Sequence, residues 1–231
     1  MTLEEAIAKI KPLDHNAMEI AQKRWDSIAK PLHSLGKLET LLIQIAGITG
    51  NAEVDLSRRG LIVMCADNGV VKEGVTQTGQ EVTAIVAENF LKYDTSVGVM
   101  CKQNHAEIFP VDMGMVTDTK VRTDHKIAYG TQNMTKGPAM TREQAVKGLE
   151  AGIDMVRELN DKGYRILATG EMGIGNTTTS SAVASVLLKQ PVEEMTGRGA
   201  GLTSEGLVRK INAIKKAIAL NDPDPEDAID V

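Results

Sequence analysis

The chain carries Gly170-Glu171-Met172-Gly173-Ile174-Gly175-Asn176-Thr177-Thr178-Thr179, a glycine-rich segment between two regular patterns. An apolar run over residues 164–168 precedes it and is interpreted as a buried strand, and residues 180–188 after it have a helical pattern. A strand, a glycine loop and a helix start together present backbone N–H groups and a positive dipole end to an anion. This arrangement predicts an α/β fold with a candidate phosphate site at the loop.

The loop matches neither of two common nucleotide motifs. It lacks the Gly-Lys-Ser/Thr of a Walker A loop, and no third glycine follows Gly173 and Gly175 at the dinucleotide spacing. Two interpretations therefore stay open: a phosphate-binding loop, or a tight turn with Thr177 or Thr178 as the helix N-cap. The Glu171 carboxylate at the mouth of the loop favours chemistry on a phosphorylated substrate.

Apolar runs at residues 61–66, 107–111 and 165–168 predict three strands, and helical patterns lie between them. One helix is predicted over residues 142–160, with Ala145, Leu149, Ile153 and Val156 on one apolar face and a Thr141 capping box before it. Such alternation predicts a Rossmann-like parallel sheet flanked by helices. Ligands bind beyond the carboxyl ends of such strands, so residues 67–69, 112–114 and 170–173 are expected to line one rim.

The pattern divides the chain into three parts. Residues 1–55 read as a helical N-terminal appendage packed on the sheet domain, with helices over 3–10, 15–28 and 38–48. Residues 56–220 form the α/β phosphate-binding core, whose last helix runs over 204–220. Residues 221–231 hold a Pro/Asp turn that normally leads into another element, so we expect them to begin a truncated C-terminal region.

The composition argues against several functions. A formal net charge of −5 and an aromatic content of 3% do not suit a nucleic-acid-binding protein. The four histidines are scattered without ligand spacing, so neither a metal nor another cofactor is expected. No apolar run approaches the roughly 18 residues of a membrane span, and the N-terminus has no apolar signal core. We therefore expect a cytoplasmic protein without membrane contact, with Cys65 and Cys101 as buried free thiols.

Ordered blocks along nearly the whole chain carry a resemblance. They are KPLHSLGKLE at 30–39, ADNGV at 66–70, EGVT at 73–76 with QEVT at 80–83, DMG at 112–114, GEMGIGNTT at 170–178, TGRGAG at 196–201 and DPED at 224–227. Together they resemble the nicotinate-nucleotide–dimethylbenzimidazole phosphoribosyltransferase family, which acts in assembly of the cobalamin nucleotide loop. The resemblance implies phosphoribosyl transfer from nicotinate mononucleotide to 5,6-dimethylbenzimidazole, giving nicotinate and α-ribazole 5′-phosphate.

The resemblance also implies which residues bind the substrates. Gly173, Gly175, Asn176 and Thr177 fit a phosphate anchor, and a second glycine loop would approach the ribose phosphate. That second loop contains Gly197, Gly199 and Gly201, and without the family it would read as a flexible connector.

Three polar residues each have two interpretations. Glu171 matches the acidic residue of the family motif, and otherwise it is a helix N-terminal acid favoured by the dipole. Lys210 matches a family active-site lysine, whereas its position beside Arg209 on a helix slightly favours a solvated face. Gln80 is expected to touch the benzimidazole, or else to be a simple first-turn helix residue.

One departure limits the resemblance. The family is longer, and its catalytic base is a glutamate in a C-terminal glycine-rich segment that no residue here matches. General-base catalysis contributes typically about 10²–10⁴-fold, so the alternative function is an inactive or weakly active nucleotide-binding fragment. A third hypothesis is an interaction protein whose exposed apolar surface a partner covers. The resemblance further implies a homodimer.

Overall fold

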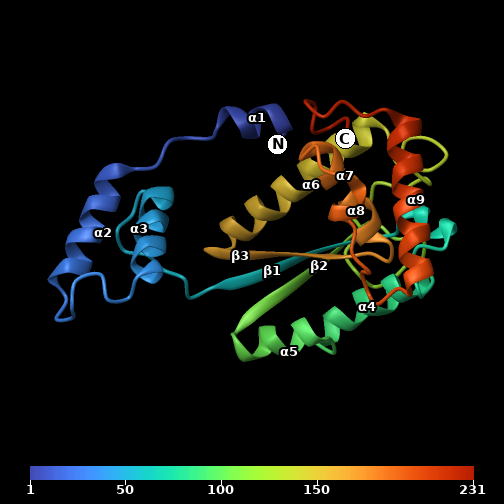
Figure 1. The fold of residues 1–231 in the computed structure, drawn as a ribbon. Helices are drawn as coiled ribbons and strands as arrows, with labels where there is room; N and C mark the ends of the chain where they lie inside the picture. Colours follow the sequence, from blue (N-terminus) through green and yellow to red (C-terminus); the bar gives the residue numbers. More distant parts are fainter.

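The computed structural model describes residues 1–231 and contains one three-stranded parallel sheet in the order β2-β1-β3 (Figure 1). The strands are β1 (Arg59–Ala66), β2 (Ala106–Gly114) and β3 (Ile166–Met172). Arg59 at the start of β1 pairs with Ala106 on one side and Ile166 on the other. The strands therefore begin level with one another, and their carboxyl ends meet at one edge of the sheet.

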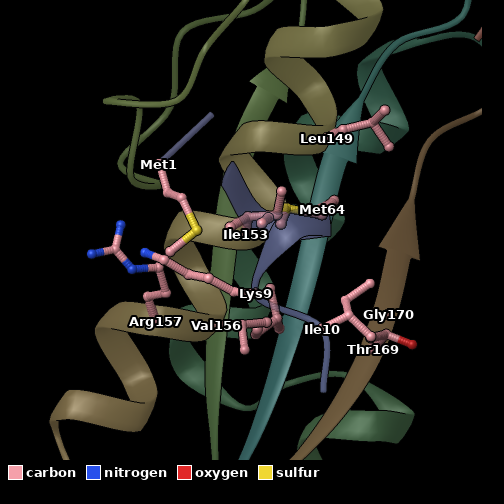
Figure 2. Close-up of a pocket in the computed structure, with 13 residues that line it drawn as sticks. Met1, Lys9, Ile10, Met64, Leu149, Ile153, Val156, Arg157, Thr169 and Gly170 are labelled. Atoms are coloured by element: carbon pink, nitrogen blue, oxygen red, sulfur yellow. The ribbon is translucent and has the colours of Figure 1, made fainter. Parts of the chain in front are cut away.

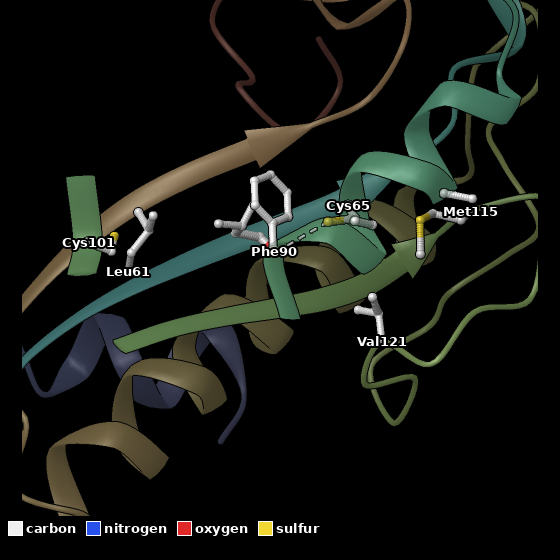
Figure 3. Packing of buried hydrophobic residues seen from close by; sticks show 9 residues of the cluster. Leu61, Cys65, Phe90, Cys101, Met115 and Val121 are labelled. Carbon is white, nitrogen blue, oxygen red and sulfur yellow. Dashed lines mark hydrogen bonds between the residues drawn. The ribbon is translucent and has the colours of Figure 1, made fainter. Parts of the chain in front are cut away.

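Helices cover both faces of β1, because its side chains alternate. Leu61, Val63 and Cys65 pack toward α4 (Glu81–Lys92) and α5 (Ser96–Gln103) in one apolar cluster (Figure 3). On the opposite face, Ile62 packs with Met155 and Leu159 of α6 (Arg142–Asp161). The expected Rossmann-like parallel sheet flanked by helices is confirmed.

The start of α6 follows the sequence, but its apolar face does not enter the core. Thr141 forms the capping box with Gln144 as expected. The residues that α6 buries are Ala151, Met155 and Leu159, which lie on a different side of the helix from the apolar face that the pattern singles out. That apolar face instead lines a groove of about 600 Å³ between α1, α6 and the β1–β3 pair (Figure 2), with Leu149, Ile153 and Val156 among its residues.

The prediction that β3 is a buried strand is wrong. β3 is an edge strand that pairs with β1 alone, and most of its side chains are exposed, including Ile166 at 42%. An apolar run shows that a strand forms, but it does not show whether neighbours cover both of its sides. β3 also extends to Met172, so Glu171 lies inside the strand rather than in the loop after it.

A third apolar cluster lies beyond the carboxyl ends of the strands. It joins α7 (Asn176–Leu187), α8 (Val192–Met195), α9 (Ser204–Asn221) and a 3₁₀ turn over Gly69–Glu73. Ile214 of α9 is fully buried in this cluster. Figure 1 shows α9 standing across this end of the sheet. The packing fixes α9 against α7, which brings two separate glycine-containing segments together.

The N-terminal helices are α1 (Leu3–Ala8), α2 (His15–Ser27) and α3 (Lys37–Thr49), which confirms the helical appendage. Only part of it packs as expected: α1 contacts α6, whereas α2 and α3 pack on each other and their hairpin projects away from the sheet (Figure 1). The boundaries near residues 55 and 220 stay predictions. Cys65 and Cys101 are buried free thiols, as expected. None of the helices combines the length and the apolar character that crossing a bilayer requires.

Candidate active site

The glycine loop makes a tight turn from β3 into α7. Gly175 is the N-cap of α7 with φ +93°, a left-handed conformation that favours glycine, and no side chain caps this helix. The alternative in which Thr177 or Thr178 caps the helix is therefore wrong. A Cβ on Gly173 would lie 2.3 Å from the carbonyl oxygen of Ala66, so this position requires glycine. α7 begins at Asn176, four residues before the predicted start at Ser180.

The Asn176 side chain connects the strand end to the helix start. Its Nδ2 donates to the Glu171 carboxylate, and its Oδ1 accepts the Thr177 N–H at 2.7 Å. The Thr178 N–H donates to the Gly175 carbonyl at 2.9 Å. These bonds satisfy the N–H groups of Thr177 and Thr178 and place the positive end of the α7 dipole at the carboxyl end of β3, with Glu171 beside it.

Lys210 is the least expected member of the site. It lies on α9 and only 1% of it is exposed, so the interpretation as a solvated lysine is wrong. Its Nζ donates to Thr177 Oγ1 at 2.7 Å and to the Gly197 carbonyl at 3.1 Å. Both acceptors are neutral, and burial lowers the pKa of Lys210 below its ordinary value. A buried ammonium with neutral partners is a strong candidate to bind an anion.

The second glycine loop lies against the first. A Cβ on Gly199 would stand 2.9 Å from Thr177 Oγ1 and 3.5 Å from Lys210 Nζ, so this part of the loop passes directly beside both side chains. Gly199 and Gly201 have φ of +57° and +103°, and the Gly201 carbonyl accepts a hydrogen bond from Gln77. The structure therefore does not support a loosely attached connector here.

Gln80 is joined to the glycine loop through Asn68, the second residue after β1. It is the N-cap of α4, and its Nε2 donates to the Asn68 carbonyl at 3.1 Å. The Asn68 side chain in turn donates to the Ile174 carbonyl in the glycine loop at 3.1 Å. Gln80 thus binds Asn68, and Asn68 binds the glycine loop.

Two acidic residues of the expected rim turn inward. Asp67 and Asp112 are fully buried, and both bind backbone N–H groups of the turn after β2. Lys126 forms an ion pair with Asp112 at 3.1 Å. These two carboxylates hold the turn over residues 114–116 rather than face the rim.

Glu171 lies beside the start of α7, where it accepts the hydrogen bond from Asn176. Desolvation raises the pKa of Glu171 above its ordinary value, and the hydrogen bond from Asn176 opposes that shift. Glu171 and Lys210 are linked through the neighbouring residues Asn176 and Thr177. No group of three or more His, Cys, Asp or Glu side chains is arranged to hold a metal ion.

The block over residues 30–39 lies outside this site, in the connection between α2 and α3. There Lys30 Nζ and the buried Glu39 carboxylate form an ion pair at 2.9 Å. The hydrogen bond to Lys30 is the largest cause that lowers the pKa of Glu39. In this chain the pair joins the connection after α2 to the first turn of α3.

Comparison with known proteins identifies the family. A family model described as "Phosphoribosyltransferase" matches residues 10–231. The nicotinate-nucleotide–dimethylbenzimidazole phosphoribosyltransferase of Ruminiclostridium cellulolyticum is 51% identical over 233 residues, covering 100% of this chain and 66% of that protein. The chain belongs to the nicotinate-nucleotide–dimethylbenzimidazole phosphoribosyltransferase family.

Other family members support the assignment in sequence and in fold. The Clostridium tetani phosphoribosyltransferase of this name is 47% identical, covering 99% of this chain and 64% of that protein. The crystal structure of CobT from Thermus thermophilus superposes with a TM-score of 0.81 at 36% identity, covering 89% of this chain and 62% of that chain. The chain thus spans slightly less than two thirds of the length of these phosphoribosyltransferases.

Proposed function

We propose that this chain binds nicotinate mononucleotide and transfers its phosphoribosyl group to 5,6-dimethylbenzimidazole, giving nicotinate and α-ribazole 5′-phosphate for the cobalamin nucleotide loop. The observation that carries the proposal is Lys210, a buried lysine that donates to two neutral oxygens, Thr177 Oγ1 in the first turn of α7 and the Gly197 carbonyl in the second glycine loop. A phosphate bound there would give the Lys210 ammonium an anionic partner, which its two neutral acceptors do not provide. The identity of the two substrates is inferred from the family to which the chain belongs.

The phosphate anchor combines two independent sources of positive potential. The start of α7 provides the positive end of the helix dipole, and Lys210 adds a full charge beside Thr177. The second glycine loop packs directly against both groups at Gly199, where an added Cβ would stand 2.9 Å from Thr177 Oγ1. The ribose attached to this phosphate would then extend toward Glu171 and the carboxyl end of β3.

The remaining residues have roles in the transfer itself. Displacement at the anomeric carbon develops positive charge on the ribose, and the Glu171 carboxylate stabilises that charge electrostatically. Gln80 would contact the benzimidazole from the start of α4. The base that takes the benzimidazole N–H proton matches no residue of this sequence, so we assign it to none.

Nucleotide binding should weaken as the pH rises through the lowered pKa of Lys210. A bound phosphate favours the charged ammonium, so the pKa of Lys210 is higher in the complex than in the free protein. Between those two pKa values binding requires uptake of one proton, and the dissociation constant rises up to about tenfold per pH unit. The second ionisation of a phosphate monoester has its midpoint near about pH 6, and its completion above that pH adds negative charge, so it cannot cause weaker binding at higher pH. Calorimetric titration from about pH 7 to about pH 10 measures this, in two buffers of different ionisation enthalpy. An affinity that stays constant with no proton uptake would contradict the anchor role of Lys210.

Replacing Glu171 by Gln should slow transfer and leave the fold intact. The amide keeps the shape and one acceptor for Asn176 but removes the charge that faces the ribose. Loss of one electrostatic group in an active site typically costs about 10²–10³ in kcat. The measurement is the rate of α-ribazole phosphate formation, with thermal unfolding as the check on folding. Full activity of Glu171→Gln would contradict the proposal that Glu171 stabilises the charge on the ribose.

The test of the proposed function is direct. The chain is mixed with nicotinate mononucleotide and 5,6-dimethylbenzimidazole, and the release of nicotinate and α-ribazole 5′-phosphate is followed by chromatography. Formation of both products supports the transferase. Binding of the nucleotide without product supports the alternative, a nucleotide-binding fragment without turnover. The homodimer and the cytoplasmic location stay predictions from the sequence.

A further inference from the structure

One residue in the glycine loop is held at both its N–H and its carbonyl by side chains to which the sequence analysis gave no supporting role. Ile174 lies between Gly173 and Gly175. Its N–H donates to Thr83 Oγ1 at 3.0 Å, and its carbonyl accepts from Asn68 Nδ2 at 3.1 Å. These bonds span 91 and 106 residues of sequence, so they join the loop to α4 and to the end of β1.

The two partners of Ile174 are themselves fixed. Thr83 is fully buried in the first turns of α4, where a β-branched side chain has few rotamers. Asn68 is held through its carbonyl by Gln80 at 3.1 Å. The loop therefore rests on side chains with little freedom to move.

Asn68 also fills the space beneath the two glycines. A Cβ on Gly173 would lie 3.0 Å from Asn68 Nδ2, and a Cβ on Gly175 would lie 3.2 Å from Asn68 Cβ. The glycines are thus required partly because Asn68 occupies this position.

We propose that Thr83 and Asn68 are positioning residues that fix the backbone N–H and carbonyl of Ile174 and thereby set the anion-binding conformation of the loop between β3 and α7. The inference rests on the proposed function for the identity of the anion. Neither side chain has to contact the substrate for this role. They act by holding in advance the geometry that a phosphate requires, so that binding does not have to order the loop.

The test compares Thr83→Val with Thr83→Ser. Valine has nearly the same shape but no acceptor, so the Ile174 N–H would lose its partner, whereas serine keeps the hydroxyl. Two quantities are measured for each variant: the amide exchange rate of Ile174 by NMR, and the dissociation constant for nicotinate mononucleotide by calorimetry. We expect Thr83→Val to exchange faster at Ile174 and to bind about tenfold more weakly. Thr83→Ser should stay within about threefold of the wild type in both.

Asn68→Ala removes the other side-chain hydrogen bond to Ile174, the one to its carbonyl. It should also weaken binding about tenfold, and the double variant Asn68→Ala/Thr83→Val should lose clearly less than the product of the single losses, because both act on one loop conformation. If Thr83→Val does not fold, the amide exchange rate of Ile174 and the nucleotide affinity of Asn68→Ala test the positioning role.

The outcomes separate this inference from the proposed function. Amide exchange needs no ligand, so unchanged Ile174 exchange in Thr83→Val and in Asn68→Ala would overturn the positioning role. Unchanged nucleotide affinity in a variant whose exchange rises would overturn it as well, and so would a serine variant that behaves like the valine variant. Ile174 exchange could be slow in the wild type and in Thr83→Ser and fast in Thr83→Val while the wild type binds no nucleotide. That result would refute the proposed function but would still show that Thr83 holds the loop.

Discussion

Lys210→Met should weaken the binding of nicotinate mononucleotide by about 10- to 100-fold. A hydrogen bond to a charged group contributes typically about 1.5–3 kcal/mol, and the methionine side chain provides neither the charge nor the donors. The substitution should leave thermal stability unchanged or raise it, because the free protein no longer buries an ammonium whose partners are neutral. Calorimetry gives the affinity, and a thermal unfolding scan gives the stability.

Lys216→Met is the matched control, since Lys216 lies on the same helix but is exposed. It should bind the nucleotide like the wild type. Free 5,6-dimethylbenzimidazole carries no phosphate, so its affinity should be unaffected by either substitution. Equal affinity of Lys210→Met and Lys216→Met for the nucleotide would contradict the anchor.

Gly173→Ala should destabilise the protein and impair nucleotide binding together. The added Cβ would meet the Ala66 carbonyl oxygen at 2.3 Å, and this contact is with backbone that cannot rotate away. Overpacking of this kind costs typically about 1–3 kcal/mol, and for a chain of this size each kcal/mol lowers Tm by about 2–4 °C. The displaced loop should also lose nucleotide affinity. Both effects are measured by unfolding scans with and without the nucleotide.

Gly152→Ala controls for the loss of a glycine elsewhere. Gly152 is inside α6 and a Cβ there has no neighbour within 4 Å, so alanine should stabilise the helix by about 1 kcal/mol. An unchanged Tm and an unchanged nucleotide affinity in Gly173→Ala would show that the loop tolerates a side chain against the Ala66 carbonyl.

Local patterns predicted the framework of this fold well. The helices over Arg142–Asp161 and Ser204–Asn221 were predictable because each has a regular apolar period and α6 also has a capping box. The parallel sheet followed from the alternation of strands and helices. The helices depend on residues that are close together in sequence, and the sheet type follows from the order of the elements along the chain.

Two misjudged elements show where local patterns fail. β3 is apolar and yet exposed, because coverage of a strand depends on distant segments. The start of α7 was placed too late, since residues 176–179 are asparagine and threonines, which have low helix propensity, and a glycine rather than a capping side chain precedes them.

The site residues depended still more on tertiary contacts. Lys210 sits beside Arg209 in a pattern typical of a solvated face, but α7 and the second glycine loop pack against it and bury it. Thr83 belongs to a block that matched the family, but nothing in its surroundings indicated a bond to a loop 91 residues away. Side-chain-to-backbone hydrogen bonds across such separations leave no periodic signal in a sequence.

Lys210 and the start of α7 together form the proposed phosphate anchor for nicotinate mononucleotide, on which the other assigned roles depend. The most direct measurement is a calorimetric titration of the 231-residue chain with this nucleotide, compared with nicotinate riboside, which lacks the phosphate. We predict saturable binding of the nucleotide at one site and at least about tenfold weaker binding of the riboside. Equal affinities for the two ligands, or no binding of the nucleotide, would contradict the anchor.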